Sequence, residues 1–144
     1  MQKNDIITLE KPDFSFPKAE HLKSERIISV LFKGKASSIG AYPLRAVWQE
    51  VDFFYDTQNP TIHCQVAVTA PKKTFKRAHD RNRYKRLIRE AYRLNKHEWL
   101  PFLQENKKKI ALMIIFTGKE ATDFDTINHK IKKMFTKMIR EIGT

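Results

Sequence analysis

One amphipathic basic helix constrains this fold more than any other part of the sequence. Residues 81–93 read RNRYKRLIREAYR. Wound at about 100° per residue, the segment gathers its basic side chains in one sector and its apolar side chains in the opposite sector. The first sector holds Arg81, Asn82, Lys85, Arg86, Arg89 and Arg93, and the second holds Tyr84, Leu87, Ile88 and Ala91. The apolar sector must be covered, so the chain needs a packing surface such as a sheet.

Segments on both sides of the helix supply strands for that sheet. Residues 42–55 and 61–70 are rich in aromatic and β-branched side chains, and a turn at Asn59-Pro60 predicts that they form an antiparallel pair. The apolar run at residues 109–118, KIALMIIFTG, predicts a further, buried strand. Residues 97–108 are interpreted as a connection that Pro101 breaks.

Two more helices are expected from apolar side chains that repeat every three or four residues. One covers residues 24–33, with Ser24 as its N-cap, and the other covers residues 123–142, with Thr122 as its N-cap. Glycines at positions 34 and 143 end them. The predicted class is α+β, with helices packed on one sheet.

The prolines near the N-terminus divide the chain into two unequal parts. Pro12 and Pro17 predict that residues 1–18 form an extended segment lying on the domain. Residues 19–144 then form a single domain, since a chain of this length can bury a sizeable core.

The charge balance indicates an anionic partner, with nucleic acid as the leading candidate. The 144 residues include 28 Lys plus Arg against 16 Asp plus Glu, a net charge of +12. Residues 72–93 hold ten basic and two acidic side chains, so two thirds of the excess lies there. Arginine suits phosphate because its planar fork forms bidentate hydrogen bonds. The longest apolar run, residues 110–116, is too short to span a membrane, and the N-terminus lacks a signal-peptide core, so we expect a cytoplasmic protein.

The residue types that carry catalysis do not converge in this sequence. Cys64 is the only cysteine, and the five histidines are scattered without metal-ligand spacing. No Ser-His or Cys-His pairing is suggested, and the carboxylates are interpreted as solubilising or helix-start charges. These carboxylates are Asp52, Asp56, Asp123 and Asp125. We therefore expect no catalytic residue and no protein-bound metal.

A family resemblance covers all but residues 1–13. The segment AVTAPKK followed by RNRYKRLIREAYR resembles the protein subunit of bacterial ribonuclease P, whose RNR helix follows a strand ending in a Lys-Lys pair. HLKSERIISVLFKGK, residues 21–35, is similar to that family's first helix. The resemblance implies an α-β-β-β-α-β-α order similar to ribosomal protein S5 domain 2, with residues 37–41 as the extra strand. It also implies a left-handed βαβ crossover, against the usual right-handed rule.

The same resemblance implies a function and its residues. The partner is a large catalytic RNA, and the joint particle removes the 5′ leader from precursor tRNA with Mg²⁺ held by the RNA. The positions expected to bind the RNA subunit are Arg81, Asn82, Arg83, Lys85, Arg86, Arg89 and Arg93, with Lys72 and Lys73. The leader is expected in a cleft between the first helix and the sheet, lined by Ile28, Phe32, Val47 and Trp48. At Ile28 an apolar contact replaces the base stacking that many relatives obtain from Phe.

Two other binding functions fit parts of the sequence. A ribosomal or other structural RNA-binding protein is the alternative, because a basic helix on a small α+β sheet also suits ribosomal RNA. A DNA-reading helix is less favoured, since the elements before Arg81 are predicted strands and not the first helix of a helix-turn-helix.

Overall fold

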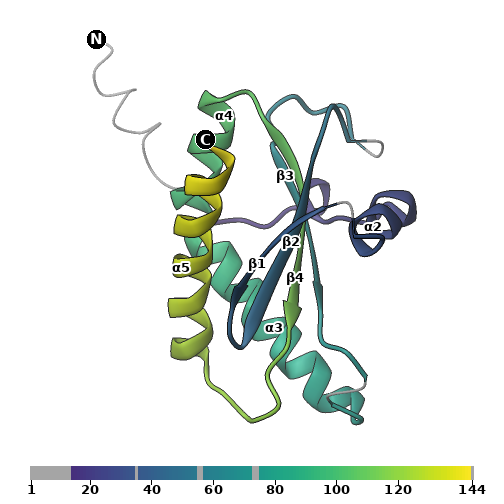
Figure 1. Ribbon diagram of the computed structural model, residues 1–144, viewed down its shortest axis with the longest axis vertical. Coiled ribbons are helices and arrows are strands. Elements are labelled where there is room, and N and C mark those ends of the chain that lie inside the picture. Colours follow the sequence, from purple (N-terminus) through teal and green to yellow (C-terminus); the bar gives the residue numbers. More distant parts are fainter. Residues whose placement is uncertain (1–13, 35, 55–56, 73–74, 144) are drawn as a thin grey trace.

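A four-stranded mixed sheet lies at the centre of the computed structural model, which describes residues 14–34, 36–54, 57–72 and 75–143 (Figure 1). Its strands are β1 (Ser37–Ala41), β2 (Leu44–Val51), β3 (Cys64–Thr69) and β4 (Lys109–Phe116), in the spatial order β1-β2-β4-β3. β2 pairs antiparallel with β1 and β4, whereas β3 pairs parallel with β4. The most apolar strand, β4, is therefore internal, as expected for a strand covered on both faces.

The predicted antiparallel pairing of residues 42–55 with residues 61–70 is wrong. β4 lies between β2 and β3 and forms hydrogen bonds with both. The predicted strands left only residues 56–60 between them, a length that suits a hairpin, whereas the observed connection covers residues 52–63 and is much longer than the roughly two to five residues that usually join one. The extra strand at residues 37–41 is confirmed as β1, which joins β2 through Tyr42 and Pro43.

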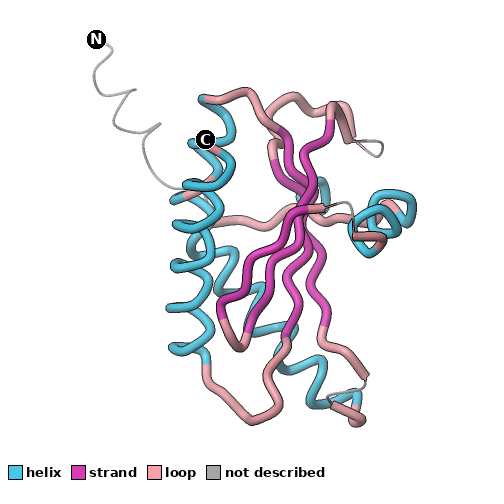
Figure 2. Tube along the Cα trace, in the orientation of Figure 1, coloured by secondary structure: helices cyan, strands magenta, loops and turns pink. Residues whose placement is uncertain are grey.

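Helices cover both faces of the sheet (Figure 2). They are α2 (Glu25–Phe32), α3 (Ala78–Asn95), α4 (Leu100–Glu105) and α5 (Phe124–Ile142), with short 3-10 turns η1 (Lys18–Glu20) and η2 (Lys96–Glu98). α3 and α5 pack on one face and α2 on the other. In the described ranges, no helix combines the length and apolar character of a membrane span.

The α-β-β-β-α-β-α order is confirmed, with α4 added between α3 and β4. Pro101 does not break that connection, because it sits in the first turn of α4, where a helix needs no backbone N–H. β3, α3 and β4 form a βαβ unit with adjacent parallel strands. Its left-handed crossover and the likeness to ribosomal protein S5 stay predictions.

Two separate cores follow from the alternation of side chains along β4. Ile110, Leu112 and Ile114 face α3 and α5 in the larger core, whereas Ala111 and Met113 face α2 in the smaller one. In the larger core, the aromatic ring of Trp99 stacks on that of Phe135 with centroids 5.3 Å apart. The larger core anchors α3, and the smaller core anchors α2.

The starts of α2 and α5 were predicted to within one residue, whereas α3 begins at Ala78, three residues before the predicted basic segment. Ser24 is the N-cap of α2, where its Oγ accepts a hydrogen bond of 3.3 Å from the backbone N–H of Ile27. Thr122 is not the N-cap of α5. Asp123 takes that place, and its Oδ1 accepts a hydrogen bond of 2.9 Å from the backbone N–H of Thr126. Hydrogen bonds from the Thr126 side chain and backbone N–H hold the pKa of the Asp123 carboxyl below its usual value.

The segment before α2 crosses from the helix layer to the opposite face of the sheet (Figure 1). We call its residues 14–22 the N-terminal strap. It reaches the edge of β3, where the Leu22 backbone N–H donates to the Val66 carbonyl at 2.8 Å. The Gln65 side chain donates to the Ala19 carbonyl, also at 2.8 Å. The strap is therefore part of the folded domain, while residues 1–13 lie outside the described ranges.

Candidate nucleic-acid interface

α3 turns its basic side chains outward because its apolar side is buried in the larger core. Tyr84, Ile88 and Ala91 are at most 3% exposed, and Leu87 is partly buried. The Tyr84 ring stacks on the ring of Phe116, with centroids 4.6 Å apart and planes 7° apart. The predicted apolar sector of the helix is confirmed.

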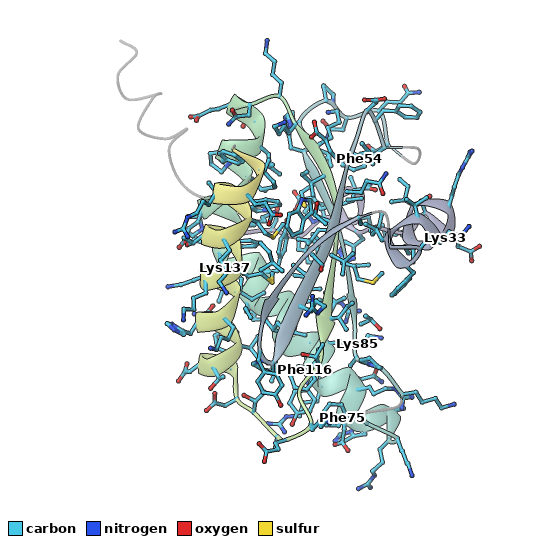
Figure 3. The ribbon with its side chains drawn as sticks, viewed as in Figure 1. Lys33, Phe54, Phe75, Lys85, Phe116 and Lys137 are labelled. Atoms are coloured by element: carbon cyan, nitrogen blue, oxygen red, sulfur yellow. The ribbon has the colours of Figure 1, made fainter. Side chains whose placement is uncertain are left out.

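The opposite face of α3 carries a row of cationic side chains. Asn82, Arg83, Arg86 and Arg89 are exposed, and Lys85 is partly buried. Within the ranges that the structure describes, no ion pair links Arg83, Lys85, Arg86 or Arg89 to an acid. Figure 3 shows nitrogen-tipped side chains extending outward at the N-terminal end of α3, near the labelled Lys85. These five residues, which we call the α3 row, are free to meet an anion.

Arg81 lies in the first turn of α3 and is partly engaged in the fold. Its Nη1 donates hydrogen bonds to the backbone carbonyls of Phe75 and Lys76, at 2.7 Å and 2.9 Å. These bonds close the loop that precedes α3. Two lysines before the helix were also predicted to bind the RNA subunit. Lys72 is exposed, and Lys73 lies outside the described residues.

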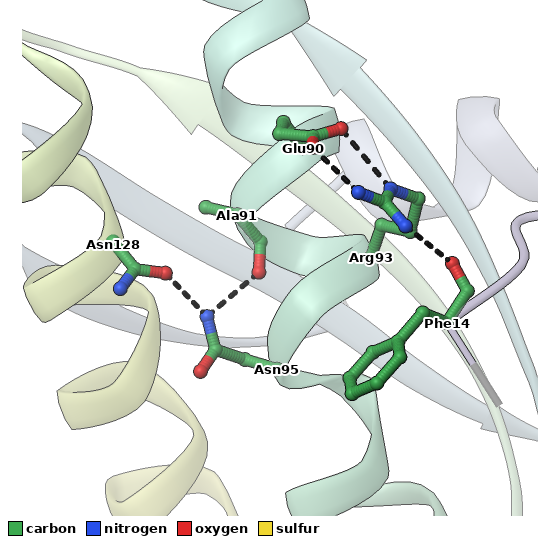
Figure 4. A network of polar contacts seen from close by, with 6 residues as sticks. All are labelled: Phe14, Glu90, Ala91, Arg93, Asn95 and Asn128. Carbon is green, nitrogen blue, oxygen red and sulfur yellow. Dashed lines mark hydrogen bonds and ion pairs between the residues drawn. The ribbon is translucent and has the colours of Figure 1, made fainter. Parts of the chain in front are cut away.

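Arg93, at the other end of the helix, is occupied by protein groups (Figure 4). Its guanidinium pairs with the Glu90 carboxylate, with the shortest contact at 2.6 Å from Nη2 to Oε2. The hydrogen bond from Arg93 lowers the pKa of the Glu90 carboxyl. Nη1 of Arg93 also donates to the Phe14 carbonyl at 3.0 Å. The charge of Arg93 is thus paired and its donors hold the strap, whereas its predicted contact with RNA stays a prediction.

The four residues predicted for the leader cleft divide between the two faces of the sheet. Val47 and Ile28 belong to the smaller core under α2, and Phe32 at the end of α2 is 62% exposed. Trp48 is 4% exposed in the larger core, on the far side of the sheet. Its assignment to the cleft is wrong, because neighbouring residues of a strand point to opposite faces.

A pocket beside α2 involves residues that the sequence did not indicate. It has a volume of about 280 Å³ and lies between α2 and the end of β2. Arg26 and Phe53 line it, and Phe53 is 55% exposed. Neither residue belongs to a recognisable motif, so no sequence signal marked them. Phe32 and Ile28 do not line this pocket.

Comparisons with known proteins show the family of this chain. A family model described as Ribonuclease P matches residues 16–139. The chain is 33% identical over 127 residues to the ribonuclease P protein component of Porphyromonas gingivalis, with 88% of each chain covered. It is 34% identical over 131 residues to that of Dictyoglomus thermophilum, covering 90% of this chain and 93% of the relative. The chain belongs to the ribonuclease P protein family.

Solved structures of ribonuclease P proteins share the fold of this family member. The Staphylococcus aureus protein superposes with a TM-score of 0.64 at 17% sequence identity, covering 84% of this chain and 96% of that one. The Thermotoga maritima protein gives a TM-score of 0.60 at 20% identity, covering 82% and 96%. As a ribonuclease P protein component, the chain is a subunit of an endoribonuclease that processes the 5′ leaders of tRNA precursors.

Proposed function

We propose that this ribonuclease P protein binds the catalytic RNA subunit through the α3 row. The observation that carries the proposal is that Arg83, Arg86 and Arg89 are exposed on a helix fixed by its buried side and form no ion pair with any acid of the described residues. Guanidinium groups held on a rigid element bind phosphate oxygens without a large loss of backbone entropy. The row positions the protein on the RNA and carries no sequence information of its own.

The proposed second surface is the α2 side of the sheet, where the single-stranded leader of precursor tRNA binds. Phe32 supports this placement because it exposes an aromatic ring at the end of α2. Val47 and Ile28 supply apolar support beside it in the smaller core. Stacking of a base on an exposed aromatic ring is worth about 1 to 3 kcal/mol and tolerates any base.

In this proposal the RNA carries the chemistry and holds the Mg²⁺, and the protein contributes binding energy. The complex works in the cytoplasm. One of the candidate carboxylates supports this division of roles, since Asp123 is used as the N-cap of α5, while Asp56 lies outside the described residues. In the described part of the chain, no group of three or more His, Cys, Asp or Glu side chains is placed to hold a metal ion. Neither DNA nor a membrane is a proposed partner.

Reconstitution with a bacterial ribonuclease P RNA tests the proposal. Cleavage of a precursor tRNA is measured over a Mg²⁺ series with RNA alone, protein alone and both together. We expect the protein to lower the Mg²⁺ concentration that cleavage requires and to cleave nothing by itself. Cleavage by RNA-free protein would refute the assignment of the chemistry to RNA, and failure to bind that RNA would favour a structural RNA-binding role.

A further inference from the structure

We propose that the N-terminal strap, β3 and α3 form a pocket for one nucleotide of single-stranded RNA. The base packs against Phe16 and His21, and the phosphate binds Arg89 and Lys23. The proposal rests on the function proposed above, because it requires RNA at the α3 row. It adds a binding site that shares Arg89 with the α3 row and uses none of Phe32, Ile28 and Val47.

The pocket has a volume of about 190 Å³ and combines three chemically distinct walls. Phe16 and His21 of the strap form an aromatic wall, and Lys23 and Arg89 form a cationic wall. The third wall is the edge of β3 at residues 66–68. An aromatic surface beside cations is the combination that proteins use for single-stranded nucleic acid.

The aromatic wall is preassembled. The Phe16 and His21 rings stack with centroids 4.1 Å apart and planes 19° apart. Phe16 also contacts the Tyr92 ring at 5.4 Å, and Tyr92 is fully buried against α5. His21 Nε2 lies 3.3 Å from the Phe16 carbonyl oxygen, which further fixes the imidazole. A base that packs here meets rings whose orientation is already set, so little side-chain entropy is lost on binding.

Polar contacts along the whole strap hold this wall in place. Glu20, which lies between Phe16 and His21 in the sequence, forms a buried ion pair with Lys96 at 2.7 Å. Arg93 holds the beginning of the strap through the Phe14 carbonyl (Figure 4). The end of the strap is fixed by the hydrogen bond from Leu22 to Val66. These contacts hold the strap at Phe14, before the two rings, at Glu20, between them in the sequence, and at Leu22, after them.

The cationic wall links the pocket to the rest of the RNA surface. Arg89 is exposed on α3 and belongs both to the α3 row and to the pocket. Lys23 is exposed and immediately precedes the N-cap of α2. Within the described residues, neither side chain has an ion pair with an acid. The pocket therefore lies between the α3 row and α2, where a strand of RNA that touches both would pass.

The edge of β3 adds groups that can bind a base or ribose. β3 is an outer strand of the sheet, and the strap meets it in a bridge only at Val66 among the residues described. Because backbone groups alternate in direction along a strand, the N–H and C=O of Val68 face the same edge as those of Val66, and Val68 lines the pocket beyond the bridge. Edge N–H and C=O groups of a sheet are ready hydrogen-bonding partners.

The nucleotide can come from the leader of precursor tRNA or from an unpaired position of the RNA subunit, which share this chemistry. The test uses full-length protein and measures two quantities. One is the Kd for ribonuclease P RNA, and the other is the ratio of holoenzyme Kd values for leader-bearing and leaderless tRNA. The variants are His21→Ala, His21→Phe and Lys23→Ala, and the control is Lys18→Ala, an exposed lysine of the strap that does not line the pocket.

We expect His21→Ala to weaken one of the two quantities by about 5- to 20-fold, as loss of one stacked base predicts. His21→Phe retains most of the wild-type value, Lys23→Ala weakens the same quantity, and Lys18→Ala does not. A loss in RNA-subunit binding identifies that RNA as the source, and a loss in the ratio identifies the leader.

Wild-type values for both His21→Ala and Lys23→Ala, in a holoenzyme that still processes tRNA, would overturn the pocket and leave the proposed function standing. Loss in His21→Ala together with an equal loss in His21→Phe and none in Lys23→Ala would also overturn it, because a displaced strap explains that pattern. No RNA binding by the wild-type protein would refute both proposals.

Discussion

Arg86 and Arg93 lie seven residues apart on one helix and have different surroundings. Arg86 is exposed and has no acid partner among the described residues, whereas Arg93 is paired with Glu90 and bonded to Phe14. The difference comes from position, since Arg93 lies where the strap crosses the helix. From residue type alone, both arginines are predicted to bind RNA. Only their neighbouring residues in the fold distinguish them.

This difference predicts that two matched substitutions affect different properties of the protein. Arg86→Ala should weaken RNA-subunit binding by about 5- to 30-fold, because a charge-assisted contact of about 1 to 2 kcal/mol is lost. Arg93→Ala should change that affinity little and instead make the strap more susceptible to limited proteolysis. Kd values and protease digestion of both variants check this. Equal loss of RNA affinity in the two would show that the paired guanidinium still reaches RNA.

Cys64 is a buried thiol that burial keeps neutral. Desolvation raises its pKa from 9.0 to about 12. We predict that it resists alkylation by iodoacetamide in the native protein at pH 8 and reacts readily in urea, since the thiolate is the nucleophile. Because the folded-state pKa is the higher one, the stabilisation from the neutral thiol is complete below about pH 9 and is lost as the pH rises towards about 12. Rapid native alkylation would contradict the burial of Cys64.

At the scale of elements, the strap depends on one buried ion pair. Lys96 is 1% exposed, and its Nζ lies 2.7 Å from Glu20 Oε1. Removal of one partner leaves a buried charge without compensation, which costs about 3 to 5 kcal/mol. Replacement of both by apolar residues avoids that cost. The pair therefore makes the position of the strap depend on the end of α3.

A double-mutant cycle measures this dependence. Lys96→Met and Glu20→Leu should each lower the free energy of unfolding by about 3 to 5 kcal/mol, and the double variant should lose less than either. Urea unfolding supplies the free energies. Additive losses would mean that the two charges do not compensate each other in the folded protein.

The helices were more predictable than the sheet, for a physical reason. A helical period identifies both the element and its buried face, as it did for Tyr84 and Ile88 of α3. A strand can be recognised from composition, but its partners depend on contacts distant in sequence, so β4 was not predicted between β2 and β3. The same weakness placed Trp48 in the cleft, since a shift of one residue changes the face.

For the whole molecule, the sheet separates the two proposed RNA surfaces. α3 packs on one face and α2 on the other, so the α3 row and Phe32 lie on different sides. The sequence predicted both surfaces, one from charge and one from resemblance. The strap pocket between them was not predicted, because it combines residues from three segments that only folding brings together.

The separation of the surfaces predicts separable functions. Phe32→Ala should reduce the advantage of leader-bearing over leaderless tRNA by about 5- to 20-fold, because an exposed stacking surface is lost, and should leave the Kd for the RNA subunit unchanged. Arg86→Ala should do the reverse. Competition binding with the two tRNA forms checks both. Parallel losses in both quantities for both variants would contradict two independent surfaces.

The salt dependence of binding to ribonuclease P RNA tests the α3 row most directly. The Kd is measured over a potassium chloride series for the wild type, for the Arg83→Ala/Arg86→Ala double variant and for the Arg93→Ala control. We predict a steep loss of affinity with salt for the wild type, a logarithmic slope that falls by about two units in the double variant, and a slope near the wild-type value in the control. An unchanged slope in the double variant would contradict the role of the α3 row in RNA binding.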